Sequence, residues 1–277
     1  MVSDLEGLLA WKGVAVLAWL LAFFLAERWR PAAVPLPPAA APAVRGGWYR
    51  VLRNLGLWLV VSALSPLIVL PLTYWASGQA LAWRPAWWSG APGLALDILL
   101  LDFLIYWWHR ANHRVPLLWR FHEVHHLDRF LDTTSALRFH FGEVLLSALA
   151  RAGVILLLGF PFASVLVFEV LVLFAAVFHH SNLKLPPGLE RALSRLVITP
   201  SIHWVHHHAR RVDTDSNYGT IFSFWDPLFG TRSAKQRDRA MPIGTEGRAE
   251  ESLPALLLHP FRGTPPALAP RETLPKS

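Results

Sequence analysis

The sequence predicts an all-α integral membrane protein with about four to five membrane helices and a cytoplasmic helical cap that carries histidine clusters. Hydrophobic residues make up 53% of the 277 residues and charged residues only 16%, and the hydrophobic residues gather in long runs. Twelve of the 13 histidines fall between His109 and His208. No cysteine is present, so disulfides are excluded and any metal must be held by His, Asp or Glu.

The first two apolar runs each predict a membrane helix. Leu8 to Ala26 is interrupted only by Lys12, which lies near one end and can reach the membrane surface. Asp4 and Glu6 precede this run, where a cleaved signal peptide would carry positive charge, so we expect a retained helix. Leu55 to Ala76 carries no charge and is long enough to span a bilayer.

The next two apolar regions carry charged residues. Pro92 to Trp108 contains Asp97 and Asp102, and we expect it to be a third membrane helix. Val144 to Phe178 is longer and is broken at Gly159–Phe160–Pro161, which predicts two helices joined as a hairpin. Each half is short for a full crossing, so we expect the hairpin to enter the bilayer only in part.

The charges of the loops predict the orientation. The loop from Glu27 to Asn54 holds five arginines against one acid, so it should be cytoplasmic. The loop around Arg84 is then external, and the chain that follows His109 and the chain that follows His179 both return to the cytoplasmic side. The net charge of +7 is therefore expected to favour contact with the inner leaflet of the membrane, and we expect no nucleic acid as a partner.

Two segments outside these helices have biased compositions. Pro31 to Pro42 is rich in proline and alanine and predicts a stiff linker. The chain after Met241 is polar and rich in proline, so we expect a tail that is partly disordered or draped on the surface.

The spacing of the histidines predicts a site for two metal ions. Residues three or four apart share one helix face, whereas adjacent residues point about 100° apart, so an H-x-x-H-H group can serve two ions. A lone histidine more often caps a helix or bonds to a backbone carbonyl, but three spaced clusters favour metal. His208 falls outside the repeated pattern, and His259 in the tail is expected to have no role in the site. The predicted ligands are His109, His113, His122, His125, His126, His203, His206, His207 and, as a ninth, His180.

Carboxylates and amides near these clusters are expected to orient the imidazoles. Asp102 lies seven residues before His109 on nearly the same helix face. We expect it either to accept an imidazole N–H from a neighbouring helix or to pair with an arginine. His140 and His179 are weaker candidates, as ligands or as orienting groups. The remaining candidates are Glu123, Glu143, Asn182, Asp215 and Asn217.

These motifs resemble those of the fatty acid hydroxylase / sterol desaturase superfamily, and of its bacterial sterol desaturase members. The match covers about His109 to Thr231, with the three histidine boxes in the family's order. The shorter segments that also resemble the family are Thr133–His140, His180–Asn182, Asn217–Gly219 and Trp225–Thr231.

The resemblance implies two non-haem iron ions, O₂ as co-substrate, and electrons from a separate reductase or small carrier. It implies that a sterol-like or fatty acyl lipid is hydroxylated or desaturated, and we expect this to occur in a bacterial inner membrane. The loop charges predict that the metal site faces the cytoplasm. Residues 91–235 would form the catalytic domain, residues 1–90 the N-terminal membrane helices and linker, and residues 236–277 the polar tail. Zinc could replace iron in purified protein, because imidazole suits both metals.

Two other functions fit a histidine-rich membrane protein. A di-zinc hydrolase would normally use bridging carboxylates, and Glu123 is the only acid inside the clusters. A metal transporter or sensor would place its ligands near mid-span, whereas these ligands gather at helix ends. Both features favour the oxygenase. The lipid, the choice between hydroxylation and desaturation, the electron donor and the oligomeric state remain open.

Overall fold

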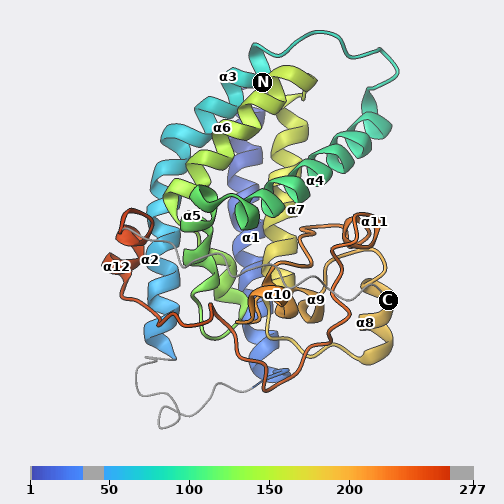
Figure 1. Cartoon of the computed structure of the whole chain (residues 1–277). Helices are drawn as coiled ribbons and strands as arrows, with labels where there is room; N and C mark the ends of the chain where they lie inside the picture. The colour runs from blue at the N-terminus through green and yellow to red at the C-terminus, as the bar shows by residue number, and fades with distance from the viewer. Residues whose placement is uncertain (1, 34–46, 263–277) are drawn as a thin grey trace.

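The fold is helical throughout the described residues, 2–33 and 47–262. In this computed structural model those residues form helices joined by loops and isolated β-bridges, with no strand (Figure 1). This confirms the predicted all-α class. The long helices are α1 (Val2–Trp29), α2 (Trp48–Leu64), α3 (Leu70–Gly78), α4 (Gly90–Arg114), α6 (Phe141–Leu158) and α7 (Phe162–His180).

Four helical stretches in the described residues are long and apolar enough to cross a membrane, and they cover the second, third and fourth predicted apolar regions. The first predicted run, Leu8 to Ala26, lies within α1. In the first of the four stretches, α2 continues into α3 through a short π-helical turn, Ser65–Val69, where Pro66 removes a backbone donor from the helix. The four are Trp48–Gly78, Gly90–Arg114, Phe141–Leu158 and Phe162–His180.

The helices α6 and α7 of the hairpin extend beyond the apolar run from Val144 to Phe178 at both ends. Its helices have 18 and 19 residues, so at 1.5 Å per residue they are about 27 and 29 Å long. That is close to the ~30 Å hydrocarbon thickness of a bilayer, so each helix is long enough for a full crossing, contrary to our expectation. The predicted break is present: Gly159 ends α6 at φ 68°, in the left-handed region that favours glycine.

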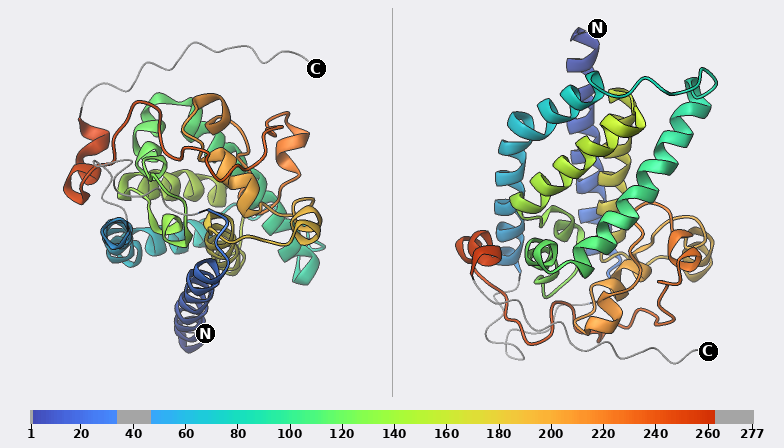
Figure 2. Two further views of the ribbon diagram at one scale, coloured as in Figure 1. Left: turned by 90° about the horizontal axis from the view of Figure 1, so that it is seen from below. Right: turned by 45° about the horizontal axis from the view of Figure 1, so that its top comes forward.

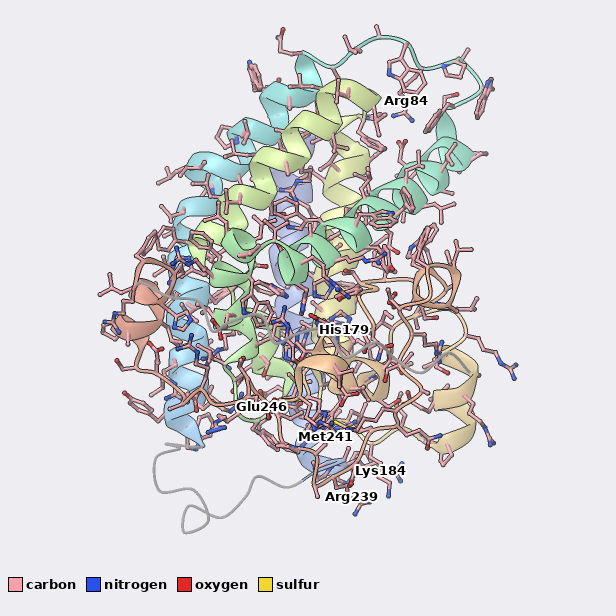
Figure 3. All side chains as sticks on the ribbon, in the orientation of Figure 1. Arg84, His179, Lys184, Arg239, Met241 and Glu246 are labelled. Atoms are coloured by element: carbon pink, nitrogen blue, oxygen red, sulfur yellow. The ribbon has the colours of Figure 1, made fainter. Side chains whose placement is uncertain are left out.

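The two ends of the bundle differ. The loop with Arg84 lies at one end, and the segments with the histidine boxes lie toward the opposite end, where α1 ends and α2 begins (Figures 1 and 3). All three boxes therefore lie toward one end, as the loop charges predicted. Figure 2 shows the short helices of the cap gathered across this end of the long helices. The assignment of this end to the cytoplasm stays a prediction.

The cap is built from short helices that pack under the bundle. It contains α5, which carries the second histidine box, and α9, which carries most of the third. The elements are α5 (Pro116–His126), η3 (Thr133–Leu137), α8 (Pro187–Leu193), α9 (Pro200–His206), α10 (Arg211–Thr214) and α11 (Trp225–Leu228). Between the long helices, the core is a cluster of buried apolar side chains from α3, α4, α6 and α7 that includes Leu101, Ile155 and Phe168.

The C-terminal segment packs against the cap more closely than its composition indicated. Helix α12 (Leu253–Leu258) places Leu256, which is fully buried, against Leu57, Val124 and Leu127. Met241 and Ile243 join another core cluster. Of the two expectations for the tail, residues 241–262 fit a segment draped on the surface rather than a disordered one, because widely spaced apolar side chains anchor them. Most of the predicted linker falls on residues 34–46, and the end of the tail on 263–277, outside the described residues.

Replacing Leu256 with alanine should release this segment. The side chain has no exposed surface and meets three other buried residues, so a cavity costing about 2–5 kcal/mol of unfolding free energy is expected. Limited proteolysis in detergent should cut the variant in residues 241–262 faster than the wild type. The half-exposed neighbour Leu258 is the control, because its change to alanine should leave the cleavage rate unchanged. Equal cleavage of the two variants would contradict the anchoring role.

Candidate metal centre

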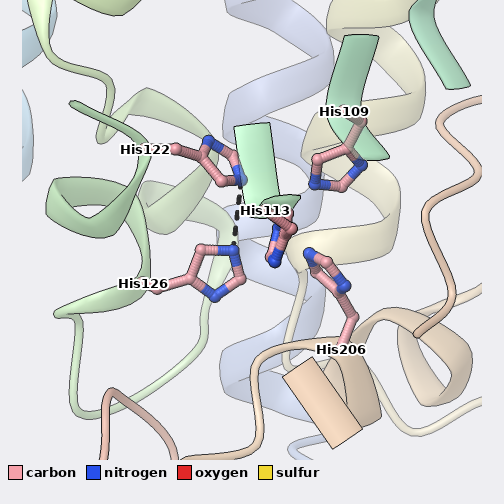
Figure 4. Close-up of side chains that lie close together, drawn as sticks. All are labelled: His109, His113, His122, His126 and His206. Carbon is pink, nitrogen blue, oxygen red and sulfur yellow. Dashed lines mark hydrogen bonds between the residues drawn. The ribbon is translucent and has the colours of Figure 1, made fainter. Parts of the chain in front are cut away.

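Five histidines from three helices form the first group. Helix α4 contributes His109 and His113, α5 contributes His122 and His126, and α9 contributes His206. One ring nitrogen from each lies within 4.8 Å of every other. Figure 4 shows the five rings turned toward a common centre, with the Nε2 atoms of His122 and His126 3.2 Å apart.

Four further histidines form the second group, which is fully buried. They are His125 from α5, His180 from the end of α7, and His203 and His207 from α9 and the residue after it. Their Nε2 atoms form a chain: His125 to His180 at 3.1 Å, His180 to His203 at 3.0 Å, and His203 to His207 at 3.1 Å. The nine predicted ligands are thus the nine residues of the two groups. That they bind metal stays a prediction.

Helical spacing explains how the boxes are divided. His122 and His126 are four apart and share the first group, while His125, turned about 100° from His126, belongs to the second. The third box is divided in the opposite sense: His203 and His207 belong to the second group and the intervening His206 to the first. Each H-x-x-H-H box therefore contributes to both groups, as the spacing predicted.

Outer hydrogen bonds orient five of the nine rings. The Nδ1 atom of each is 2.7–3.0 Å from an oxygen atom and donates to it, which leaves the Nε2 lone pair directed into the group. The acceptors are the backbone carbonyls of Tyr218 for His109, Arg138 for His125, Ala176 for His180 and Ser216 for His206, and the carboxylate of Glu143 for His122. In addition, Asp215 Oδ1 lies 3.5 Å from His113 Nδ1.

The donor set fits metal ions. Two imidazole nitrogens bound to one ion at about 2.1 Å, at right angles, lie about 3 Å apart, and the Nε2 pairs are 3.0–3.2 Å apart. Several buried ring nitrogens have no hydrogen-bond partner, among them both of His113 and the Nε2 of His206. Burying such polar atoms unpaired costs free energy, which a bound cation would offset. Nine neutral nitrogen donors in two adjacent groups suit two borderline metals such as iron or zinc.

Only two of the candidate orienting acids reach a histidine of these groups. Glu143 accepts the His122 N–H at 2.8 Å, and Asp215 approaches His113. Glu123 instead lies 3.2 Å from His259 of the tail. The carboxylate of Asp102 accepts neither an imidazole N–H nor an arginine N–H. It accepts the backbone N–H groups of Ile221 and Phe222 and the indole N–H of Trp225, which holds the 217–231 segment against α4.

The two candidate amides also act on the backbone. Asn182 exchanges hydrogen bonds with both backbone groups of Ala33, which ties the end of α7 to the segment after α1. Asn217, in a left-handed conformation at φ 52°, donates to the carbonyl of Ile202 and accepts from Ser233 N–H. Both therefore position the segments that carry the histidines, and neither forms a hydrogen bond with an imidazole of the two groups.

The four remaining histidines lie outside both groups. His140 caps α6: its Nδ1 accepts from Gly142 N–H, and its Nε2 donates to the Leu257 carbonyl. His179 is buried, its ring 4.0 Å from that of His203, but it belongs to neither group. His208 pairs with Asp213 at 2.5 Å. His259, expected to have no role in the site, pairs with Glu123 and Glu251 away from both groups.

A buried ion network beside the second group was not predicted. Arg50 of α2 pairs with Asp128 and Asp132, while Glu250 of the C-terminal segment pairs with Arg53 and Arg138. The Arg138 carbonyl accepts the His125 N–H, so this network positions a residue of the second group. Sequence reasoning missed it because the charges come from three distant segments and have no local spacing.

A cavity of about 240 Å³ opens beside both groups. It lies between α4, α6 and α7, and Ile105, Val144 and Ala176 are among its apolar lining residues. His109, His122 and His179 line its wall at the metal-centre end, where His179 is labelled in Figure 3. An apolar chain entering between the helices would therefore reach the histidines directly.

The metal-free protein should lose stability in acid. Burial and the neighbouring histidines lower the pKa of His125, His126, His203, His206 and His207 well below 6.5. The unfolded chain takes up protons near pH 6.5 and the folded chain does not, so protons favour unfolding. The unfolding free energy is therefore largest above pH 6.5 and falls below it, by about 1.4 kcal/mol per pH unit for each histidine.

Thermal unfolding of the chelator-treated protein in detergent between pH 7.5 and 5.5 measures this effect. The midpoint should fall as the pH falls, and the fall should be shallower in a variant with His207 changed to Gln, which removes one such group. A midpoint that stays constant or rises toward pH 5.5 would contradict the burial of neutral imidazoles.

The sequence was compared with known families and proteins. Residues 94–231 match the family model described as fatty acid hydroxylase. The ornithine lipid hydroxylase OlsE of Rhizobium tropici is 30% identical over 177 residues, which cover 64% of this chain and 53% of that protein. The alkylglycerol monooxygenase of Danio rerio is 32% identical over 163 residues, covering 57% of this chain and 35% of that protein.

A third relative is named for a different lipid from the first two. The cholesterol 25-hydroxylase-like protein of Danio rerio is 32% identical over 160 residues, covering 54% of this chain and 62% of that protein. The chain thus spans between about a third and about six-tenths of the length of these relatives. No solved structure matches the chain.

Proposed function

Because the chain belongs to the fatty acid hydroxylase family through residues 94–231, we propose that it is a membrane-bound, non-haem di-iron oxygenase. It would hydroxylate or desaturate a lipid C–H bond with O₂ and electrons from a separate donor. The observation that carries this proposal is the pair of histidine groups at the end of a cavity between membrane helices.

The composition of the two groups supports oxygen chemistry over hydrolysis. Within the described residues, every member of both groups is a histidine, and no carboxylate is placed to bridge them. Hydrolytic two-metal sites usually need such a bridge. The groups also draw on the last turns of α4 and α7 and on the cap helices α5 and α9 rather than on mid-helix positions, which disfavours a transporter. The choice of iron over zinc rests on the family.

The residues of the chain have separate tasks in this proposal. The nine imidazoles would hold the two ions, and Glu143 and the Tyr218 carbonyl orient His122 and His109 at the cavity wall. The bound irons would supply the reduction of O₂ and the removal of hydrogen from an unactivated C–H bond. The apolar walls from Ile105 and Val144 exclude water and hold the lipid chain beside the histidines.

The names of the relatives support a lipid as substrate. They are hydroxylases or monooxygenases named for an ornithine lipid, alkylglycerol and cholesterol, which share a long apolar part. For this chain we propose a membrane lipid of the bacterial inner membrane, fatty acyl or sterol-like. The electron donor, a reductase or a small carrier, would dock at the cytoplasmic end, where the cap lies under the helices.

Metal analysis of protein purified in detergent without chelator tests the proposal. Expression with added iron should give about two metal ions per chain, measured as iron and zinc together because zinc can replace iron. A variant with His125, His126, His206 and His207 changed to alanine should bind none. Membrane lipids of the expressing cells should gain an oxygen atom or a double bond only with the wild type. Wild-type protein without metal would overturn the proposal.

A further inference from the structure

A line of polar side chains runs along the cavity on α6. Glu143, Ser147 and Arg151 are spaced four apart, so they share one face of the helix, and all three line the cavity. Glu143 lies at the metal-centre end, where it holds His122. Arg151 lies eight residues further along, about 12 Å deeper into the bundle. The cavity is thus apolar for most of its wall and polar along this line.

Arg151 occupies a costly position for a charge. It is ten residues after Phe141 and seven before Leu158, the first and last residues of α6, so it lies near the middle of a membrane-length helix. Its guanidinium pairs with Glu169 of α7 at 3.1 Å, and both side chains keep about a fifth of their surface exposed. Ionisable groups at this depth are rare and usually serve a function.

Another ion pair, at the far end of the bundle, has a different environment. Arg84 pairs with Asp97 at 2.6 Å and also donates to the Gly159 carbonyl. Asp97 accepts from Trp88 and Ser164 as well, so this pair joins the helices at the far end. Neither member lines the cavity. The Arg84–Asp97 pair is therefore explained by packing alone, whereas Arg151 faces the space that the lipid chain would occupy.

The charges around Arg151 select the kind of group that it would bind. The pair with Glu169 is neutral overall, and the Arg151 side chain lines the cavity and keeps 23% of its surface accessible. A second anion would be repelled by Glu169, whereas a neutral oxygen can accept a guanidinium N–H without adding charge. The acceptor that fits is a hydroxyl oxygen or an ester or amide carbonyl.

Resting on the function proposed above, we propose that Arg151 is a specificity-determining residue of the lipid site. It binds a neutral oxygen atom of the lipid about 12 Å from the carbon that reacts beside Glu143 and His122. The substrate class is then a lipid with an oxygen function at that distance, rather than a plain hydrocarbon chain or one that ends in a free carboxylate.

Binding of three probes of one chain length tests this inference. The probes are tritiated 1-hexadecanol, hexadecane and palmitate, measured on purified protein in detergent against micelles without protein. The wild type should bind hexadecanol about tenfold more tightly than hexadecane, which is the discrimination that one hydrogen bond to a charged group supplies. It should also bind hexadecanol more tightly than palmitate.

Three variants separate binding from folding. The double variant Arg151→Leu/Glu169→Leu removes both charges together, and it should bind hexadecanol and hexadecane equally while keeping its metal content. Arg151→Lys keeps a donor and should retain part of the preference, even if the double variant fails to fold. Leu149→Met, on the outward face of the same helix with 52% of Leu149 exposed, should behave as wild type.

Each other result overturns the inference. A preference for hexadecanol that survives loss of the arginine would remove its role, and tighter binding of palmitate would make the site an anion site. Wild-type protein that binds no probe above the micelle blank would also refute it. None of these results bears on the metal content or on the oxidised lipids, so the proposed function would stand or fall separately.

Discussion

Replacing His207 with alanine is expected to reduce the bound metal from about two ions per chain to about one and to abolish lipid oxidation. His207 belongs to the second group, which has four members and no spare histidine. Removing a group that only orients a ligand typically costs 10- to 100-fold in metal affinity or activity, so loss of a ligand should cost more than about 100-fold.

The adjacent histidines supply matched variants. His206 belongs to the first group, which has five members, so His206→Ala should retain more of its ion than His207→Ala but still lose most activity. His208 belongs to neither group and pairs with Asp213, so His208→Ala should keep both ions and near-normal activity. Elemental analysis and mass spectrometry of cellular lipids give the two readouts. Equal metal loss in all three variants would contradict the division into groups.

The members of the two histidine groups could be predicted from the sequence, because the spacing of residues along a single helix decides which side chains share a face. His122, His125 and His126 are arranged by the 3.6-residue period alone, so their division between the two histidine groups follows without knowledge of the fold. Backbone carbonyls are different. The carbonyls of Tyr218 and Ser216 orient His109 and His206, but any residue type has a carbonyl, so nothing in the sequence marks them.

The features that could not be predicted from the sequence depend on contacts between distant parts of the chain. Leu256 lies in a segment rich in proline and polar residues, and only its contact with Leu57, Val124 and Leu127 makes it a core residue. Asp102 was expected to meet an imidazole or an arginine. Its actual partners lie about 120 residues later in the chain, a pairing that no local pattern predicts.

Asp102 organises the segment that orients His109. Its carboxylate accepts Ile221 N–H and Phe222 N–H at 3.1 Å and the Trp225 indole N–H at 2.9 Å, and the side chain is fully buried. A second buried acid, Asp226, accepts Tyr218 N–H at 2.7 Å in the same segment. The two carboxylates together fix the backbone around Tyr218, whose carbonyl holds His109.

Asp102→Ala should therefore destabilise the protein more than removal of a surface charge. Three donors around this buried carboxylate would lose their acceptor at about 1–3 kcal/mol each, which approaches the 5–15 kcal/mol total stability of a typical domain. The thermal midpoint in detergent should fall by more than about 10 °C. Asp102→Asn keeps one acceptor oxygen and should be intermediate, whereas the exposed control Asp238→Ala should match the wild type. If Asp102→Ala unfolded at the wild-type temperature, the three hydrogen bonds would not hold the segment, and the orientation of His109 would need another cause.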